Sequence, residues 1–316
     1  MPTEVTLAMV QEAAERIRPI AQRTPVLTSM AFDAQSGVSA FFKCENLQKG
    51  GAFKIRGASN LVFSLSKSEL SKGLIAYSSG NHAQATAIAA RHVGAPCTIV
   101  MPADAPRAKL EATRGYGASV VTYDRFRDNR EKVAAEIIGR TGAALIPPFD
   151  HPMIIAGQGT SALELLEQAP DLDALITPVG GGGLLSGCAV AVKGLQPNIR
   201  VFGAEPAGAN DTYLSFQSGD RVEVTPDTIA DGLRSPMPGK LTFPIIHELA
   251  EAILLVSEDE IRSALKFLLT RMKILVEPSG AVSAAAVMFG KLPKDVRRVG
   301  IVLSGGNVDF EQLAAL

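Results

Sequence analysis

The sequence predicts an α/β protein with two parallel-rich sheets, each flanked by helices. Short apolar runs alternate with amphipathic segments between about Gly73 and Pro147, and a second series of the same kind follows. Such alternation with short connections is typical of right-handed βαβ units. No linker separates the two series, and the segments before and after the first one look alike. We therefore expect a small domain at 66–150, inserted in a large domain formed by 1–65 and 151–316.

The expected elements follow in order along the chain. The helical spacing of Leu7, Val10, Ala14 and Ile17 predicts a first helix that ends before Pro19. Next come a strand at 39–45, a helix at 57–66, strands LIAYSS, CTIVMP, ASVVTY and AALIPP with helices at 81–92, 107–114 and 128–140, then strands ALITPV, RVFGAE, ILLV and RVGIVLSGG with helices after 183 and at 258–272. The last of these helices follows a serine and has acidic residues in its first turn, as helix starts prefer.

Composition narrows the class of partner. The chain has 316 residues, a formal net charge of -1 and no basic cluster, which argues against nucleic acid or an anionic membrane and favours a small molecule. Cys44, Cys97 and Cys188 lack metal-binding or disulfide spacing. There is no signal-peptide pattern and no apolar run long enough to span a bilayer. We expect a cytoplasmic protein, and we also expect a homodimer.

One stretch contains an unusual lysine. The sequence ENLQKGGAFKIRGA places Lys54 between Phe53 and Ile55, directly after a Gly-Gly pair that permits a sharp turn. Apolar neighbours remove an amine from water, lower its pKa and make it nucleophilic enough to form a Schiff base. The alternative is a lysine whose stem covers the core while its ammonium group stays solvated.

A run of four glycines follows a predicted strand and precedes a predicted helix. In Gly180, Gly181, Gly182 and Gly183 the absence of side chains lets backbone N–H groups approach an anion at the positive end of the helix, which is a usual way to hold a phosphate. The run lacks the Lys-Ser/Thr of a P-loop and departs from the dinucleotide pattern G-x-G-x-x-G. The alternative is a flexible turn.

A second loop, Ser78-Ser79-Gly80-Asn81-His82, also joins a strand to a helix. Its hydroxyl, amide and imidazole groups, together with free helix N–H groups, are suited to a carboxylate. Simple N-capping by Ser79 or Asn81 would also explain these residues. His82 is a candidate base, although a lone histidine in a first helical turn is more often structural.

Ser304, in the sequence LSGGN, belongs to a third loop at the end of a predicted strand, where it could also cap a helix. In open α/β sheets the carboxyl ends of parallel strands meet where ligands bind. We therefore expect the three loops to line one site.

Two carboxylates lie in a fourth loop, EPAGAND. Glu205 and Asp211 flank a glycine-containing turn after a strand. Hard cations such as Mg2+ or Ca2+ take carboxylate and carbonyl oxygens, but a solvated acidic turn has the same local pattern.

Eight motifs in order, AFKIRG, SSGNHAQA, IAGQGT, GGGGLLSG, EPAGAND, IADGLRS, EPSGA and LSGGN, cover nearly the whole chain. In this set the sequence resembles the serine/threonine dehydratase and serine racemase family of enzymes that use pyridoxal 5'-phosphate. The resemblance implies fold type II, the tryptophan-synthase-β type, with two α/β domains, the smaller of which closes over the substrate.

The resemblance also implies roles for individual residues. By this match Lys54 bonds the cofactor aldehyde, Phe53 packs beside the cofactor, Asn81 binds its phenolic oxygen, Gly180 to Gly183 hold its phosphate, Ser304 faces its pyridine nitrogen and Glu277 lies near its ring. Ser78, Ser79, Asn81 and His82 would hold the substrate carboxylate. The carboxylates of Glu205 and Asp211 and the carbonyl of Ala209 match the divalent cation site of the family.

The implied reaction is elimination from a β-hydroxy amino acid. Lys54, once free, takes the Cα proton, and loss of the β-hydroxyl leads to a 2-oxo acid and ammonia. If Ser79 protonates the opposite face, the product is the inverted amino acid, so a racemase is the alternative. A protein that binds the cofactor or an amino acid without turnover is a further alternative, against which the retention of Lys54, Ser79 and Ser304 argues.

Three residues bear on the substrate. Phe149 stands where eukaryotic serine racemases have asparagine and threonine dehydratases commonly have an aromatic, which favours a dehydratase. Arg130 and Ser235 match positions near a second carboxylate in serine racemases, so Arg130 would suit 3-hydroxyaspartate beside threonine and serine. The alternative for Arg130 is a solvated arginine on a helix surface.

Overall fold

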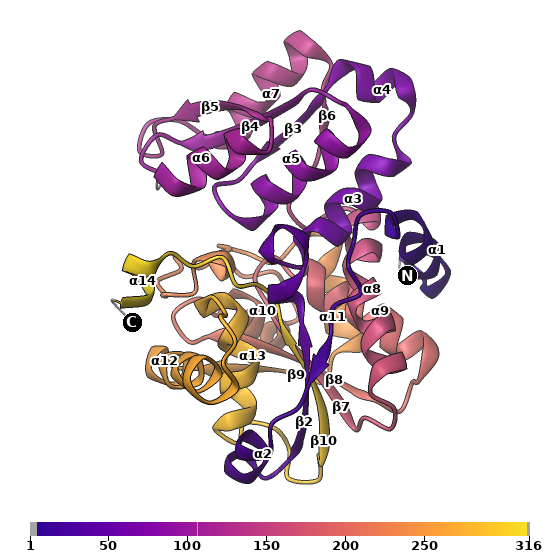
Figure 1. Cartoon of the computed structure of the whole chain (residues 1–316), viewed down its shortest axis with the longest axis vertical. Helices are drawn as coiled ribbons and strands as arrows, with labels where there is room; N and C mark the ends of the chain where they lie inside the picture. Colours follow the sequence, from indigo (N-terminus) through magenta and orange to yellow (C-terminus); the bar gives the residue numbers. More distant parts are fainter. Residues whose placement is uncertain (1–4, 106, 315–316) are drawn as a thin grey trace.

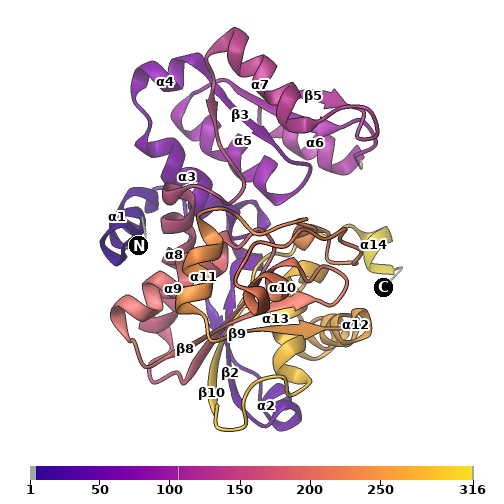
Figure 2. The same cartoon turned by 180° about the vertical axis from the view of Figure 1, so that it is seen from behind.

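A computed structural model describes residues 5–105 and 107–314. The chain forms two lobes, each built on one sheet, and helix α3 (Lys54–Ser64) lies where the lobes meet (Figures 1 and 2). The α/β class and the two parallel-rich sheets predicted from sequence are confirmed.

The larger sheet has six strands and is parallel except at one edge. In spatial order its strands are β1 Val26–Leu27, β2 Ser39–Cys44, β10 Arg298–Leu303, β7 Ala174–Pro178, β8 Arg200–Pro206 and β9 Ala252–Val256. The two-residue strand β1 pairs antiparallel with β2. It was not predicted, because two residues carry no periodic pattern.

The smaller sheet has four parallel strands. In spatial order they are β5 Ser119–Tyr123, β4 Cys97–Pro102, β3 Leu74–Tyr77 and β6 Ala144–Leu145. All four lie within 66–150, the range predicted for the small domain. The domain limits themselves, and closure over a substrate, remain predictions.

Helices flank both sheets. In the smaller lobe these are α4 Lys67–Lys72, α5 Asn81–Val93, α6 Arg107–Gly115 and α7 Arg130–Thr141. In the larger lobe they are α1 Leu7–Ile17, α2 Met30–Ser36, α8 Pro152–Gln168, α9 Gly183–Leu195, α10 Asp211–Ser218, α11 Thr242–Leu249, α12 Glu258–Phe267, α13 Pro278–Met288 and α14 Phe310–Ala314. Short 3-10 turns are η1 Glu45–Leu47, η2 Lys49–Gly51 and η3 Asp231–Leu233.

Two helix predictions need correction. The helix expected to begin at Gly57 begins at Lys54, so the unusual lysine occupies a first helical turn. The helix expected at 258–272 is α-helical only to Phe267 and continues as a π-helical turn, Leu268–Met272. Its start is as expected, because Ser257 and Glu260 form a capping box.

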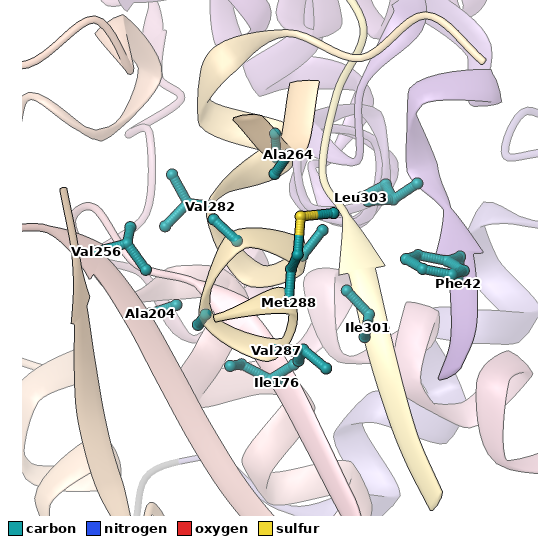
Figure 3. Packing of buried hydrophobic residues seen from close by; sticks show 14 of the residues in the cluster. Phe42, Ile176, Ala204, Val256, Ala264, Val282, Val287, Met288, Ile301 and Leu303 are labelled. Atoms are coloured by element: carbon teal, nitrogen blue, oxygen red, sulfur yellow. The ribbon is translucent and has the colours of Figure 1, made fainter. Parts of the chain in front are cut away.

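Helix α13 forms the centre of one hydrophobic core (Figure 3). Every residue from Pro278 to Met288 is buried. A helix that is apolar on all sides has no amphipathic period, which explains why it was not predicted. It packs against β7, β8, β9 and β10 in a cluster that contains Ile176, Ala204, Val256, Ile301 and Leu303. This rigid base holds the start of α13 and the end of β10 in fixed positions.

No helix in the described part of the chain combines the length and the apolar character needed to cross a membrane.

Candidate active site

A cavity of about 390 Å³ lies between the two lobes, at the carboxyl ends of strands from both sheets. Such a volume is in the range of small-molecule sites. Its lining contains every residue predicted to bind cofactor or substrate: Phe53, Lys54, Ser78, Ser79, Asn81, His82, Arg130, Gly180, Gly181, Gly182, Gly183, Ser235, Glu277 and Ser304. The three loops expected to meet therefore do so.

Lys54 lines this cavity, and its amine is buried. Its Nζ donates a hydrogen bond to the carbonyl of Pro148 at 2.7 Å and lies 5.1 Å from the centre of the Phe53 ring. Burial lowers the pKa of Lys54 to about 8. This agrees with the amine predicted from the apolar flanks and disfavours an ammonium group that stays solvated.

The loop before Lys54 is held against the end of β10. Gly50 and Gly51 have φ of 75° and 73°, a conformation that glycine adopts readily. The N–H of Phe53 donates to the carbonyl of Ser304 at 3.0 Å, and Ala52 forms an isolated antiparallel bridge with Gly305. These contacts bring the lysine and Ser304 to one side of the cavity.

The four glycines pack tightly at the start of α9. A Cβ atom at Gly181 would lie 2.3 Å from the Phe149 ring, and one at Gly182, where φ is +92°, would lie 2.7 Å from Ile246. Only glycine fits, which argues against a merely flexible turn. No side chain caps this helix, so its first N–H groups are available to an anion in the cavity.

The start of α5 is likewise without a side-chain cap, and its N-cap residue is Gly80. The capping alternative for Ser79 and Asn81 is therefore not found. Ser78 Oγ accepts from the N–H of Gly80 at 3.3 Å. Asn81 Nδ2 donates to Glu277 Oε1 at 2.7 Å. A second helix start thus opens into the cavity, and two anionic groups of one ligand could be held at once.

The protonation state of His82 indicates a structural role. Its Nε2 donates to the carbonyl of Ile146 at 2.8 Å, and burial together with the nearby charge of Lys54 lowers its pKa to about 3. The ring is neutral at ordinary pH and holds the loop against the residue that follows β6. This excludes His82 as a base that charges near neutral pH.

Ser304 and Glu277 lie together at the floor of the cavity. Both are buried, with exposed fractions of 3% and 4%. A Cβ atom at Gly305 would lie 2.2 Å from Glu277 Oε1, so this glycine lets the carboxylate approach the end of β10.

The residues expected to set specificity lie at the mouth of the cavity. The guanidinium carbon of Arg130 is 5.4 Å from the centre of the Tyr77 ring, within the range of a cation–π contact. Arg130 lines the cavity and is also exposed to solvent, so the choice between a substrate-binding and a surface arginine stays a prediction. Ser235 Oγ donates to the carbonyl of Met237 at 2.9 Å.

Sequence reasoning missed several residues of the lining, above all Tyr77 and Ser279. Ser279 Oγ accepts from the N–H of Gly232 at 2.9 Å and ties α13 to η3. The motifs EPSGA and IADGLRS contain these two partners, so the motif set already pointed to both segments. Tyr77 carried no signal, because a tyrosine at a strand end has many ordinary explanations.

Glu205, on β8, and Asp211, the first residue of α10, are buried and lie outside the lining of this cavity. Glu205 Oε2 accepts from the N–H of Tyr213 at 2.8 Å, whereas both carboxylate oxygens of Asp211 are buried without a hydrogen-bond partner. Burial raises the pKa of Asp211 to about 7, and burial together with Asp211 raises that of Glu205 well above its ordinary value. A pair of buried carboxylates in this state is not a solvated acidic turn.

Comparison with known proteins identifies the class. The family model described as pyridoxal-phosphate dependent enzyme matches residues 17–305. The chain is 50% identical to a serine racemase of Schizosaccharomyces pombe, over 96% of this chain and 95% of that one. It is 49% identical to an L-threo-3-hydroxyaspartate ammonia-lyase of Saccharomyces cerevisiae, over 98% and 96%. A crystal structure of serine racemase from Dictyostelium discoideum superposes with a TM-score of 0.92 at 50% identity, over 97% and 99%.

The chain therefore belongs to the family of pyridoxal-phosphate dependent enzymes. Its fold is type II, shared with serine racemases and threonine deaminases, and the family predicted from the eight motifs is confirmed.

Proposed function

We propose that the protein is an ammonia-lyase that eliminates water from a β-hydroxy amino acid and forms a 2-oxo acid and ammonia. A racemase that acts through the same site is the second candidate. The observation that carries the proposal is the buried Lys54 amine, which has a pKa lowered to about 8 and lies in a cavity with two open helix starts.

The cavity fits the cofactor at three points. Lys54 supplies the amine that would bond the aldehyde, the uncapped start of α9 would hold the phosphate, and Ser304 would face the pyridine nitrogen. A serine there does not require a protonated nitrogen, which favours prompt elimination. Phe53 and Glu277 would lie beside the ring. When bound, pyridoxal phosphate stabilises negative charge that develops at the substrate Cα.

The start of α5 would hold the substrate carboxylate. The uncapped backbone N–H groups, that of Asn81 among them, and the side chains of Ser78 and Ser79 would supply donors, and neutral His82 holds the loop in place. This fixes the amino acid with its Cα near Lys54.

Lys54 would then take the Cα proton, because an amine with a pKa near 8 is largely able to accept a proton at mildly alkaline pH. The β-hydroxyl would leave with a proton as water, and addition of water to the resulting enamine would give the 2-oxo acid and ammonia. Return of a proton from Ser79 to the opposite face would give inversion instead, which is the basis of the racemase candidate.

We infer 3-hydroxyaspartate as the preferred substrate, ahead of threonine and serine. Arg130 is held at the mouth by Tyr77 and offers a planar pair of donors to a second carboxylate, with Ser235 nearby in the lining. The 49% identity to an L-threo-3-hydroxyaspartate ammonia-lyase supports this.

A substrate panel tests the proposal. L-threonine, L-serine and threo-3-hydroxyaspartate are each incubated with holoenzyme while 2-oxo acid and D-amino acid are measured. We expect 2-oxo acid from all three, fastest from hydroxyaspartate. Formation of D-amino acid without 2-oxo acid would contradict the lyase assignment and support the racemase assignment.

Arg130→Ala sharpens the test. It should lower kcat/KM for hydroxyaspartate by on the order of 10- to 100-fold, the effect of one charged hydrogen-bond partner. It should change kcat/KM for threonine little. Arg127→Ala, an exposed arginine outside the cavity lining, is the matched control. Equal losses of kcat/KM on both substrates would show that Arg130 does not bind the second carboxylate of the substrate.

We also propose a divalent cation, Mg2+ or Ca2+, at Glu205 and Asp211 with the carbonyl of Ala209. Among the described residues no group of three or more His, Cys, Asp and Glu side chains could hold a metal. A hard cation completes its shell with carbonyls and water, so two carboxylates suffice. The partnerless oxygens of Asp211 support this site.

We further propose a cytoplasmic homodimer in which the 66–150 lobe closes over the substrate. The three cysteines are free and buried, and burial raises the pKa of each to about 12, as suits unreactive thiols in a reducing compartment. Sedimentation of the holoenzyme tests the dimer; a monomer at micromolar concentration would contradict it.

A further inference from the structure

We propose that Asn307 is a positioning residue that fixes the orientation of the Asn81 side-chain amide, and so keeps one Asn81 N–H directed at the bound cofactor. This inference rests on the proposed role of Asn81 beside the cofactor's phenolic oxygen. Asn307 itself does not line the cavity, whereas Asn81 does.

The hydrogen bonds around Asn81 define its orientation. Asn307 Nδ2 donates to Asn81 Oδ1 at 2.9 Å, and Asn81 Nδ2 donates to Glu277 Oε1 at 2.7 Å. An amide whose oxygen faces a donor and whose nitrogen faces a carboxylate has a single satisfactory orientation. In that orientation Asn81 Nδ2 uses one of its two hydrogens for Glu277 and retains the other for a ligand.

Asn307 is itself held on both sides. Its Nδ2 also donates to the carbonyl of Gly50 at 2.7 Å, so both amide hydrogens are used. A Cβ atom at Gly51 would lie 2.2 Å from Asn307 Oδ1, and φ there is +73°, so this position accommodates the Asn307 side chain only as glycine. The N–H of Gly306 donates to the carbonyl of Gly51 at 2.9 Å.

Asn307 thereby joins three parts of the site that are far apart in the sequence. The Gly50–Gly51 turn leads to Lys54, the segment before Asn307 carries Ser304, and Asn81 begins α5 in the smaller lobe. Because Asn81 bonds to Asn307 and Glu277, the smaller lobe meets the larger one through the residue that would contact the cofactor.

Substitution of Asn307 should remove the single satisfactory orientation of the Asn81 amide. In Asn307→Asp the new carboxylate can only accept, so the Asn81 oxygen faces a carboxylate in either orientation, that at position 307 or that of Glu277. The N–H reserved for the cofactor is then lost or redirected. Asn307→Ala leaves Asn81 Oδ1 without its donor and frees the amide to take either orientation.

Two readouts on the holoenzyme test the inference. One is the dissociation constant of pyridoxal phosphate, measured by fluorescence. The other is the balance of the two visible-absorbing forms of the bound cofactor across pH, which reports the proton beside the phenolic oxygen. We expect Asn307→Asp and Asn307→Ala to shift this balance and to weaken binding about tenfold, the effect of one hydrogen bond.

Asn46→Ala is the matched control. Asn46 Nδ2 donates to the carbonyl of Leu275 at 2.9 Å, so this variant also loses a buried amide bond near the end of β10 but none to Asn81. It should lower stability without altering the absorbance balance. An equal spectral change in Asn46→Ala would reduce Asn307 to a structural role and overturn the inference.

A double-mutant cycle with Asn81→Ala separates the remaining outcomes. If Asn307 acts through Asn81, the spectral effect of Asn307→Asp disappears once Asn81 is alanine. Wild-type spectra and binding in Asn307→Asp would overturn the inference alone. A wild-type protein that neither binds pyridoxal phosphate nor absorbs in the visible would instead overturn the proposed function.

Discussion

Lys43 and Lys54 are both partly or wholly removed from water, yet their surroundings differ completely. Lys43 Nζ, on β2, donates to Glu164 Oε2 at 2.5 Å, to Gln168 Oε1 at 2.8 Å and to the carbonyl of Thr24 at 2.8 Å. Lys54 donates to a single backbone carbonyl, that of Pro148. Among the described residues no carboxylate forms an ion pair with Lys54, whereas Lys43 pairs with Glu164.

The difference appears in the pKa values. Burial lowers the pKa of Lys43, but the carboxylates of Glu45 and Glu164 oppose that effect and favour the ammonium form. At Lys54 burial acts without such opposition and lowers the pKa to about 8. A buried lysine with carboxylates remains a charged structural group; a buried lysine without them becomes a nucleophile and a base.

The region around Lys43 extends into a charged network. Arg56, fully buried on α3, pairs with Glu45 through Nε at 2.7 Å and with Glu164 through Nη1 at 2.7 Å. The network joins β2, α3 and α8 behind the cavity. It therefore supports the helix that begins at Lys54, although it does not touch the Lys54 amine.

The largest expected effect separates the two lysines by activity. Lys54→Met should lower 2-oxo acid formation by on the order of 10³-fold or more, because it removes both the cofactor anchor and the base. Lys43→Met should retain most of the wild-type kcat/KM in its folded fraction. Turnover of threonine by the two purified variants measures this, and substantial turnover by Lys54→Met would contradict the assignment.

The second effect is on stability, where substitution of the two lysines should change the free energy of unfolding in opposite directions. Lys43→Met leaves Glu164 with one cationic partner fewer and should lower the free energy of unfolding by about 3 kcal/mol. Lys54→Met removes a desolvated amine that has no counter-charge and should stabilise the apo-protein at neutral pH.

Thermal or urea unfolding of both apo-variants measures these changes. Adding Glu164→Gln to Lys43→Met should recover part of the loss, because the pair is coupled. Destabilisation of the apo-protein by Lys54→Met would show that the lysine is a structural group after all.

A pH series sharpens the same comparison. The folded pKa of Lys54, about 8, is below its ordinary value of 10.5, so the unfolded chain binds more protons in between. Its contribution therefore raises stability as pH rises from about 8 to about 10.5. The difference in unfolding free energy between wild-type and Lys54→Met apo-protein should shrink over this window. A constant difference would mean an ordinary, solvated lysine.

Glu205 and Asp211 provide a third case for comparison with the two buried lysines. Here two buried groups of the same charge lie close together. Asp211 has a folded pKa of about 7 against its ordinary 3.8, so the stability of the cation-free protein falls as pH rises through this interval. A cation that replaces the proton stabilises above about pH 7 and little below about pH 5. At about 100 times its Kd it adds roughly 2.7 kcal/mol, or about 5–10 °C.

Melting of chelated protein with and without Mg2+ or Ca2+ at both pH values measures this. Asp211→Asn should abolish the cation effect, and Asp220→Asn, an exposed acid just beyond α10, should leave it intact. The same cation response in both variants would argue against the site.

The sequence was informative where chemistry is local. Apolar flanks predicted the lowered pKa of Lys54, and glycine or serine loops after buried strands predicted where the cavity lies, because parallel strands share one carboxyl edge. The family motifs contain most of its lining. Element boundaries were less accurate, as at the π-helical turn 268–272, where the apolar pattern continues without a break.

Pairings between distant residues could not be predicted from one sequence. Arg56 and Glu164 are 108 positions apart, and Asn81 and Glu277 are 196 apart. Of the two carboxylates that favour the charged form of Lys43, Glu45 is close in the sequence, but Glu164 on α8 is 121 positions away. The distinction between the two lysines is a property of tertiary packing.

Borohydride reduction of the holoenzyme, followed by peptide mass mapping, tests the central claim most directly. Reduction makes the bond between the cofactor and its lysine permanent. We expect loss of the visible band and a pyridoxyl group on Lys54 alone, with Lys43 unmodified in the same digest. A pyridoxyl group on Lys43 or another lysine, or a protein that carries none, would contradict it.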